Sequence, residues 1–193
     1  MPTHSTRMTG SVRPATIADL PAIAGIHKRR FAAHALGRYS TTLIGRFYRE
    51  LLSSATFLVH EQEHGLDGFV VGAEQKVCRQ CKYRFMRTCL LRVAWETLGQ
   101  PEAVWPALRQ AIRQLRLAAR EFPSLAEFRL LSIAVDERVE GTGVGTRLIT
   151  AFERQVSNTW PLYGLSVHRE NSRAIRFYEK LGFEIEQARD SEI

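Results

Sequence analysis

The chain has 193 residues and a formal net charge of +7, with 45% hydrophobic and 24% charged residues. This length and composition favour one globular domain with a sizeable core, and no apolar run reaches the roughly 18 residues of a membrane span. Residues 1–10 lack the apolar stretch of a secretory signal, so we expect a disordered tail there and a cytoplasmic protein. Three closely spaced cysteines, Cys78, Cys81 and Cys89, also favour a reducing compartment. Because no fourth ligand stands nearby, they predict no metal site.

The first third of the chain predicts a strand, two helices and a hairpin. Ser11–Arg13 has the pattern of a short strand. Asp19 is a suitable N-cap for a helix that extends to about Ala33. A second helix is predicted over Thr41–Leu52, where apolar residues share one face. The runs TFLVHEQ and GFVVGAE on either side of His64-Gly65 predict an antiparallel hairpin.

The positive charge is concentrated between residues 76 and 120. This segment holds ten basic residues opposed only by Glu96 and Glu102, so it carries +8 while the rest of the chain is close to neutral. Apolar spacing predicts helices at Arg79–Leu98 and Pro106–Arg120. Such a basic face could bind an anionic acceptor, nucleic acid or an anionic membrane surface. It could equally be a solvated face whose arginines lie over apolar neighbours.

The second half of the chain alternates strands and helices. FRLLSIAV (Phe128–Val135) is apolar and nearly uninterrupted, as in a central buried strand. A glycine-rich loop follows and leads into a helix that reaches about Asn158. LYGLSVH then predicts a strand, SRAIRFYEKL a helix, and FEIEQA a last strand. This alternation indicates an α/β protein with some parallel pairing.

The glycine loop has the features of an anion site. A strand, a glycine loop and a helix in succession point several backbone N–H groups at one spot, at the positive end of the helix dipole. Thr146 and Arg147 stand where a Walker loop needs Gly and Lys. A dinucleotide fingerprint would also need glycine at position 146. The bare pattern therefore leaves two alternatives, another kind of phosphate loop or merely a tight turn.

Two stretches resemble the GCN5-related N-acetyltransferase (GNAT) family. In SIAVDERVEGTGVGTRLI, Gly143 and Gly145 match the two small positions of the family's Arg/Gln-x-x-Gly-x-Gly/Ala pyrophosphate loop. LSVHRENSRAIRFYEKLGF resembles the family's second signature. The matching residues there are Asn171, Tyr178, Gly182 and Phe183.

The resemblance implies a mixed α/β (α+β) fold with a strongly twisted mixed sheet, whose parallel fourth and fifth strands splay apart. It implies one N-acetyltransferase domain over residues 11–193. The helical basic segment, residues 76–122, is then an insertion between the third and fourth strands. The fold usually closes with one more strand than this chain provides. The sheet edge would then be open, covered by the inserted helices, or completed by a second copy in a homodimer.

The resemblance also implies acetyl-CoA as cosubstrate and a set of site residues. Tyr178 would be the catalytic proton donor to the departing thiolate, and the N–H of Val135 would polarise the thioester carbonyl. From the residues alone, Phe177 and Tyr178 could be packing aromatics and Asn171 a helix cap. The complete set of expected cofactor-binding residues is Ile133, Val135, Glu140, Gly141, Thr142, Gly143, Val144, Gly145, Thr146, Asn171, Phe177 and Tyr178.

Two positions depart from the family pattern. Glu140 stands where the family has Arg or Gln, and its carboxylate should repel a pyrophosphate unless it points away or pairs with Arg138 or Arg147. Ser166 stands where related peptide acetyltransferases place a glutamate base. The general base is therefore unassigned. Its candidates are His27, His60, Glu61 and His168.

Two hypotheses follow for the function. The first is an N-acetyltransferase that transfers acetyl from acetyl-CoA to a primary amine by direct attack. The acceptor would be a small amine, an amino sugar or a peptide amine, and could be anionic. The alternative is a catalytically silent module on the same fold, which senses CoA or binds an anionic partner.

Overall fold

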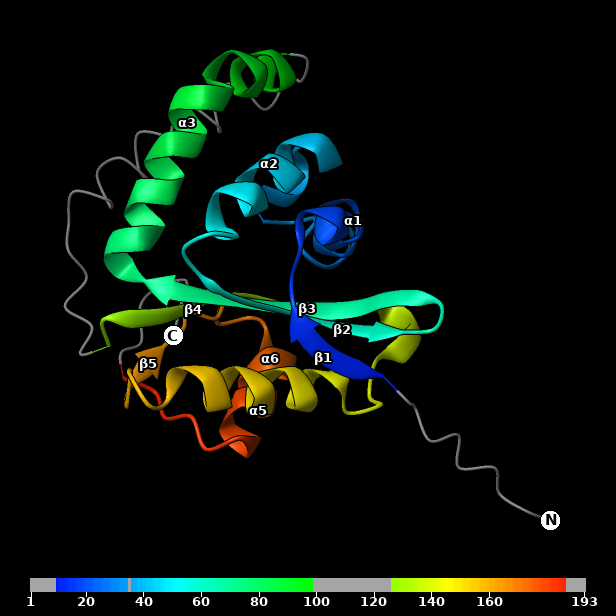
Figure 1. The fold of residues 1–193 in the computed structure, drawn as a ribbon, viewed down its shortest axis with the longest axis vertical. Helices are drawn as coiled ribbons and strands as arrows, with labels where there is room; N and C mark the ends of the chain where they lie inside the picture. Colours follow the sequence, from blue (N-terminus) through cyan, green and yellow to red (C-terminus); the bar gives the residue numbers. More distant parts are fainter. Residues whose placement is uncertain (1–9, 35, 99–125, 187–193) are drawn as a thin grey trace.

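The computed structural model describes residues 10–34, 36–98 and 126–186, and within them one sheet (Figure 1). Its strands lie in the order β1-β2-β3-β4-β5. The pairs β1/β2, β2/β3 and β3/β4 are antiparallel, whereas β4 and β5 are parallel. The strands are β1 (Ser11–Pro14), β2 (Thr56–Gln62), β3 (Gly65–Glu74), β4 (Phe128–Val135) and β5 (Tyr163–Gly164). The mixed sheet and its parallel β4/β5 pair confirm the predicted fold class.

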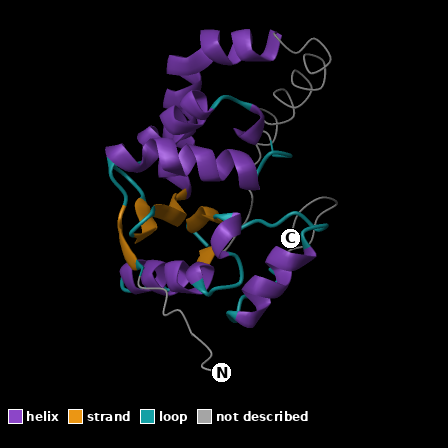
Figure 2. Ribbon diagram, turned by 90° about the vertical axis from the view of Figure 1, so that its right-hand side faces the viewer, coloured by secondary structure: helices purple, strands orange, loops and turns teal. Residues whose placement is uncertain are grey.

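Helices cover both faces of this sheet (Figures 1 and 2). On one face lie α1 (Leu20–Arg30), α2 (Thr41–Leu51) and α3 (Gln75–Leu98). On the other lie α5 (Val144–Val156) and α6 (Ser172–Lys180). None of the described helices combines the length and the apolar character that crossing a bilayer requires.

Alternation along the strands divides the core into two layers. Successive side chains of a strand point to opposite faces, so Val59 and Phe69 pack with α1 and α2, and Leu58 and Val70 pack with α5. Gly72 of β3 is required by the second layer. A Cβ atom at that position would meet the Phe152 ring and lie 2.9 Å from the Arg129 carbonyl oxygen.

The predicted helices of the first half are confirmed, with ends that differ by a few residues. The first helix begins after a 3-10 turn (Ile17–Asp19), and it ends at Arg30 instead of about Ala33. Asp19 is its N-cap residue, but the carboxylate bonds elsewhere. It accepts from the Thr16 N–H at 2.7 Å and from Arg13 at 2.8 Å.

Two strands predicted near the C-terminal end differ from the structure. The strand expected over LYGLSVH is reduced to Tyr163–Gly164, and residues 183–186 of the expected last strand are not a strand. Gly182, at φ 87°, turns the chain back. Phe183 then packs against Tyr163 and Tyr178, with ring centroids 5.4 and 5.3 Å away. Because β5 is only two residues long, it offers a further strand almost no edge to pair with.

The described part of the basic segment is α3, which starts directly after β3. Its exposed basic residues are Lys76, Arg79, Lys82, Arg84, Arg87 and Arg92. Cys81 and Cys89 are buried on its inner side, and all three cysteines are free. Among the described residues, no three His, Cys, Asp or Glu side chains are placed to hold a metal ion. The tail at 1–9 and the predicted helix Pro106–Arg120 lie outside the described residues.

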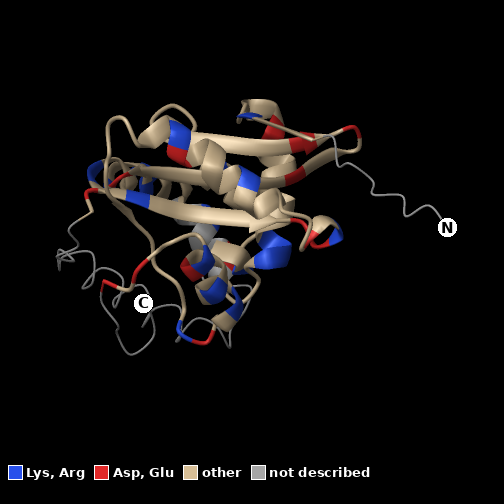
Figure 3. Ribbon diagram, turned by 90° about the horizontal axis from the view of Figure 1, so that it is seen from below, with Lys and Arg blue, Asp and Glu red and all other residues tan. Residues whose placement is uncertain are grey.

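Charge on the opposite side is mixed in sign. Figure 3 looks onto the α5 side and shows Lys and Arg residues interspersed with Asp and Glu residues. In contrast, α3 has no acidic residue before Glu96. The described residues therefore agree with the expected concentration of positive charge in this segment.

Candidate functional site

The loop between β4 and α5 is a bare stretch of backbone. After β4 the chain makes a 3-10 turn (Glu137–Val139) and then passes through Gly141 and Gly143, at φ 78° and 88°. These are left-handed conformations that glycine adopts readily and other residues rarely adopt. A Cβ atom at either position would have no neighbour within 4 Å. The backbone conformation requires glycine here, and the space in front of the loop is open.

The start of α5 presents N–H groups to this space. The Arg147 N–H donates to the Gly143 carbonyl at 3.0 Å and closes the first turn of the helix. The N–H groups of Val144, Gly145 and Thr146 therefore have no acceptor within the helix, and they lie at its positive end. Thr142 is different, because its N–H and its hydroxyl both donate to the Val139 carbonyl, at 3.3 and 2.6 Å. Thr142, which was expected to bind the cofactor, thus uses both its N–H and its hydroxyl to stabilise the turn.

Gly145 allows close packing between α5 and α6. A Cβ atom there would lie 3.3 Å from the Phe177 ring and 3.7 Å from a methyl group of Val135. Phe177 also packs against the Tyr178 ring, at a centroid distance of 5.3 Å. Phe177 therefore packs α6 against the first turn of α5, and Gly145 of that turn lies beside Val135 at the end of β4.

The open side of β4 adjoins this loop. β5 pairs only with Phe128 and Arg129 of β4, so the rest of β4 has no described strand on that side. The Asp136 N–H, one residue beyond β4, donates to the Asp67 carbonyl at 2.6 Å, toward β3. Because backbone N–H groups alternate sides along a strand, those of Ile133 and Val135 point away from β3. Both face the side that β5 has left open.

Helix α6 carries the residues of the second signature. The Asn171 side chain accepts from the Ala174 N–H at 3.1 Å, so it caps the helix, as one of its expected roles requires. Tyr178 is 9% exposed and packs against Phe177 and Phe183. Burial raises the pKa of Tyr178 to about 12, so the phenol is neutral at physiological pH. The aromatic packing and the chemistry expected of Tyr178 are compatible.

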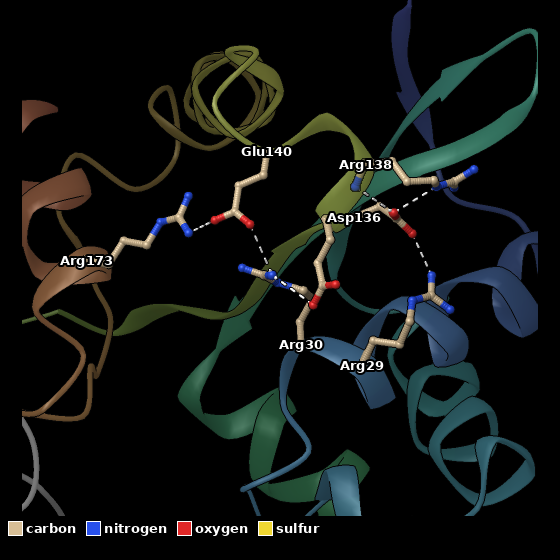
Figure 4. A network of polar contacts seen from close by, with 7 residues as sticks. Arg29, Arg30, Asp136, Arg138, Glu140 and Arg173 are labelled. Atoms are coloured by element: carbon tan, nitrogen blue, oxygen red, sulfur yellow. Dashed lines mark hydrogen bonds and ion pairs between the residues drawn. The ribbon is translucent and has the colours of Figure 1, made fainter.

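Glu140, the departure from the family pattern, lies between two arginines from distant elements (Figure 4). One carboxylate oxygen is 3.3 Å from a guanidinium nitrogen of Arg30, at the end of α1. The other forms an ion pair with Arg173, in the first turn of α6. The expected pairing with Arg138 does not occur, because the Arg138 Nε donates to Asp136 at 2.9 Å. Glu140 thus connects the glycine loop to both α1 and α6.

Asp136 fixes the other end of the loop to α1. Its carboxylate accepts from Arg29 at 2.6 Å, and from the side chain and N–H of Arg138 at 2.9 and 3.1 Å (Figure 4). The Arg138 hydrogen bond, with Arg29 adding to it, lowers the pKa of Asp136 well below its usual range. Asp136 remains ionised at any pH near neutral and holds the turn after β4 in place.

A buried polar chain that the sequence analysis missed reaches β4 from the α1–α2 layer. The His27 Nδ1 atom lies 2.7 Å from the Tyr48 hydroxyl, which lies 3.3 Å from the Ser132 hydroxyl. Burial lowers the pKa of His27 to about 4 and raises the pKa of Tyr48, so both are neutral at pH 7. Ser132 is the one polar side chain after Arg129 in an otherwise apolar strand. This was the feature of the sequence that could have indicated the polar chain.

The four candidate bases lie apart from one another in the structure. His27 bonds Tyr48, as above. His60 is buried with its Nδ1 3.3 Å from a carboxylate oxygen of Asp67. Glu61 accepts from Arg13 at 2.6 Å, and His168 is exposed. Among the described residues, no contact places any of these four side chains at the open side of β4. The general base therefore stays unassigned.

Comparison with known proteins identifies the loop and α6 as parts of one known domain. Residues 106–185, which include β4, the glycine loop, α5 and α6, match the family model described as an acetyltransferase (GNAT) domain. The matched stretch covers 80 of the 193 residues, and over that stretch the chain is similar to a GNAT domain. The match begins at residue 106, inside the segment expected to be an insertion. No curated protein matches the sequence.

Solved structures show the GNAT fold over nearly the whole chain. An N-acetyltransferase from Staphylococcus aureus Mu50 is similar with a TM-score of 0.67 and 15% identity, covering 94% of this chain and 96% of that one. The PaiA N-acetyltransferase from Thermoplasma acidophilum, solved in complex with coenzyme A, has a TM-score of 0.55 and 17% identity, covering 96% of each chain. Ard1 from Thermoplasma volcanium has 24% identity and a TM-score of 0.56, covering 92% of this chain and 84% of that one.

Proposed function

We propose that this protein transfers an acetyl group from acetyl-CoA to a primary amine. The observation that carries the proposal is the juxtaposition of two open backbone features. These are the bare glycine loop at the start of α5, and the side of β4 that β5 leaves unpaired. The T. acidophilum neighbour of the same fold was solved with coenzyme A, which supports the cosubstrate.

The two open features suit the two halves of coenzyme A. The pyrophosphate would accept hydrogen bonds from the N–H groups of Val144, Gly145 and Thr146, where the helix dipole also favours an anion. The pantetheine amides would pair with the main chain of Ile133 and Val135, as an added strand pairs with a sheet edge. The Val135 N–H would then donate to the thioester oxygen and stabilise the negative charge that develops on it.

Tyr178 would assist the leaving sulfur. A thiol has a pKa of roughly 8.5, about three and a half units below the pKa of about 12 of Tyr178 in the ligand-free protein. Complete proton transfer from this phenol to a thiolate would thus cost about 4 to 5 kcal/mol. We therefore assign Tyr178 as a hydrogen-bond donor that stabilises the developing thiolate.

The reaction needs no covalent enzyme intermediate. The amine nitrogen attacks the thioester carbonyl carbon, the C–S bond breaks, one proton leaves the nitrogen and one proton ends on sulfur. The acceptor amine must first be neutral. Among the described residues, Ser132 is the polar side chain of β4 nearest in sequence to Ile133 and Val135. It lies on the α1–α2 face, bonded to Tyr48.

The alternative is a catalytically silent module that binds coenzyme A or an anionic partner. Two observations favour it: a carboxylate at position 140, and at position 166 a serine, whose hydroxyl accepts from Arg129 at 2.7 Å. An acetyl-transfer assay with an amine library, following thiol release, distinguishes the two functions. We expect wild-type turnover and a loss of about 100- to 1,000-fold in kcat for Tyr178→Phe, the range seen for loss of one donor to a developing charge.

Coenzyme A affinity is the control in this assay. Tyr178→Phe removes only the hydroxyl and keeps the ring that packs against Phe177 and Phe183, so binding should change less than about threefold. Wild-type binding of coenzyme A without turnover of any amine would instead support the silent module. Equal turnover by both proteins would remove Tyr178 from the mechanism.

A further inference from the structure

Glu140 directly precedes the glycine loop in the chain, and its carboxylate lies beside the proposed phosphate site. Its two oxygens face guanidinium groups from two different helices, Arg30 of α1 and Arg173 of α6 (Figure 4). The three residues are far apart in sequence and meet only in the fold. An acidic side chain there opposes phosphate binding, yet the fold surrounds it with cations.

The geometry around Glu140 is that of an anion site with its anion in place. Guanidinium groups form paired hydrogen bonds with carboxylates and with phosphates alike. The N–H groups at the start of α5, which begins four residues after Glu140, add a positive potential nearby. Arg173 is a cation in the first turn of α6, where the helix dipole disfavours it. A nearby anion relieves that cost, whether it is Glu140 or a phosphate.

We propose that Glu140 acts as an internal competitor for the phosphates of coenzyme A. In the ligand-free protein its carboxylate holds Arg30 and Arg173. When the cosubstrate binds, a phosphate takes the place of the carboxylate on Arg173, and Glu140 retains Arg30. The inference rests on the proposed function and adds Arg173 to the residues that bind the cosubstrate, with Glu140 as the residue that sets its affinity.

The exchange is expected to have a small cost. The Arg173 side chain is 66% exposed and that of Arg30 is 28% exposed, and ion pairs open to solvent contribute little. Such a competitor weakens binding without preventing it. It also acts selectively on ligands that carry phosphate, which gives the inference a specific signature.

The test compares Glu140→Gln with the wild type by calorimetric titration of three probes: coenzyme A, dephospho-coenzyme A and pantetheine. Glutamine keeps the shape of the side chain and removes its charge. We expect both phosphate-bearing probes to bind roughly 3- to 10-fold more tightly to Glu140→Gln. Pantetheine, which has no phosphate, should bind the two proteins equally.

Glu137→Gln is the matched control. Glu137 lies in the same loop and is 3.4 Å from the same nitrogen of Arg30, but no contact with Arg173 is described for it. Its substitution removes the same charge, so an affinity within about twofold of the wild type is expected. If Glu137→Gln tightened binding as much as Glu140→Gln, the effect would be general electrostatics and the inference would be wrong.

Arg173→Gln completes a double-mutant cycle. If Glu140 acts by holding Arg173, the gain from Glu140→Gln should shrink by at least half in the Arg173→Gln background. An undiminished gain would contradict the exchange. Weaker binding by Glu140→Gln than by the wild type would also overturn it, because Glu140 would then be a brace that orients the arginines for the ligand.

Failure of the inference and failure of the proposed function give different results. If the wild type and Glu140→Gln bind coenzyme A equally, only the internal competition is excluded. If neither protein binds any of the three probes, the proposed function is excluded and the competition with it. Thermal unfolding of each variant shows that the comparison is made on folded protein.

Discussion

At the scale of single residues, His27 and Tyr48 are buried polar groups whose protonation is tied to folding. His27 is 6% exposed, and its Nε2 atom is buried without a hydrogen-bond partner. Desolvation, with His34 adding to it, lowers the pKa of His27 to about 4. The neutral imidazole is therefore the form that fits between α1 and α2.

This burial predicts a pH dependence of stability. The folded pKa of His27, about 4, lies below the unfolded value of about 6.5, so the unfolded chain binds the proton first. Stability is complete above about pH 6.5 and is lost as pH falls toward 4. Between pH 7 and pH 5 the His27 contribution should fall by about 2 kcal/mol. Urea unfolding at both pH values measures this loss.

The His27→Gln variant isolates that contribution. Glutamine does not titrate, so the variant should lose less stability than the wild type over the same pH interval, whatever its stability at pH 7. Burial also lowers the pKa of His60, and this contribution is common to both proteins and cancels in the comparison. Equal losses in the two proteins would show that His27 is not protonated on unfolding in this range.

The partners of Glu140 show what the sequence could not supply at this scale. The sequence identified position 140 as anomalous and suggested arginines two and seven residues away. The structure supplies Arg30 and Arg173, which are 110 and 33 residues away along the chain. Local spacing predicts contacts within one element, whereas these contacts depend on how α1 and α6 dock on opposite sides of the sheet.

At the scale of elements, the contact between β3 and α5 depends on a glycine. Gly72→Ala would drive a methyl group into the Phe152 ring and toward the Arg129 carbonyl oxygen. Overpacking of this kind costs about 1–3 kcal/mol, so we expect a clear loss in the free energy of unfolding by urea. A second substitution, Phe152→Leu, should recover part of it, because leucine frees the space where the ring lies.

Gly45→Ala is the opposite case and serves as control. Gly45 lies within α2, and a Cβ atom there would meet its nearest neighbours at 3.9 and 4.0 Å, which is ordinary contact. Alanine in a helix interior is more favourable than glycine by about 0.5–1 kcal/mol, so this variant should be more stable than the wild type. A Gly72→Ala protein as stable as the wild type would contradict the packing described for α5.

The elements that the sequence predicted well are the helices whose apolar residues recur at helical spacing. α2 and α5 have apolar residues at helical spacing, and their predicted and observed ends agree within one or two residues. Strand β5 and the expected last strand have suitable residues, but a strand exists only where a partner edge is available. The length of β5 is set by the separation of its chain from β4, and no local pattern records that separation.

At the scale of the whole molecule, two structural layers meet at the end of β4. Tyr48 of the α1–α2 layer bonds Ser132 of β4, and on the other side Gly145 of α5 lies beside Val135. Between them lie the bare glycine loop and the edge of β4 beyond Arg129, where no described strand pairs with it. The sequence located the loop and Tyr178 from two motifs. The resemblance also implied that β4 and β5 splay apart, but not that their pairing ends after Phe128 and Arg129.

The account predicts that the glycine loop is where coenzyme A is held, and calorimetric titration of acetyl-CoA tests this most directly. Gly143→Asp places a side chain and a negative charge where φ is 88° and the space is open. Gly65→Asp is the matched control, because Gly65 has a φ of 112° and equally open space at the β2–β3 turn. Both variants carry similar backbone strain and the same added charge.

We expect micromolar binding by the wild type and by Gly65→Asp, and at least 30-fold weaker binding by Gly143→Asp, a loss of about 2 kcal/mol. This pattern would establish the loop as the phosphate cradle. Equal binding by Gly143→Asp and Gly65→Asp, or no binding by the wild type at millimolar acetyl-CoA, would mean that the loop is only a turn and would contradict the account.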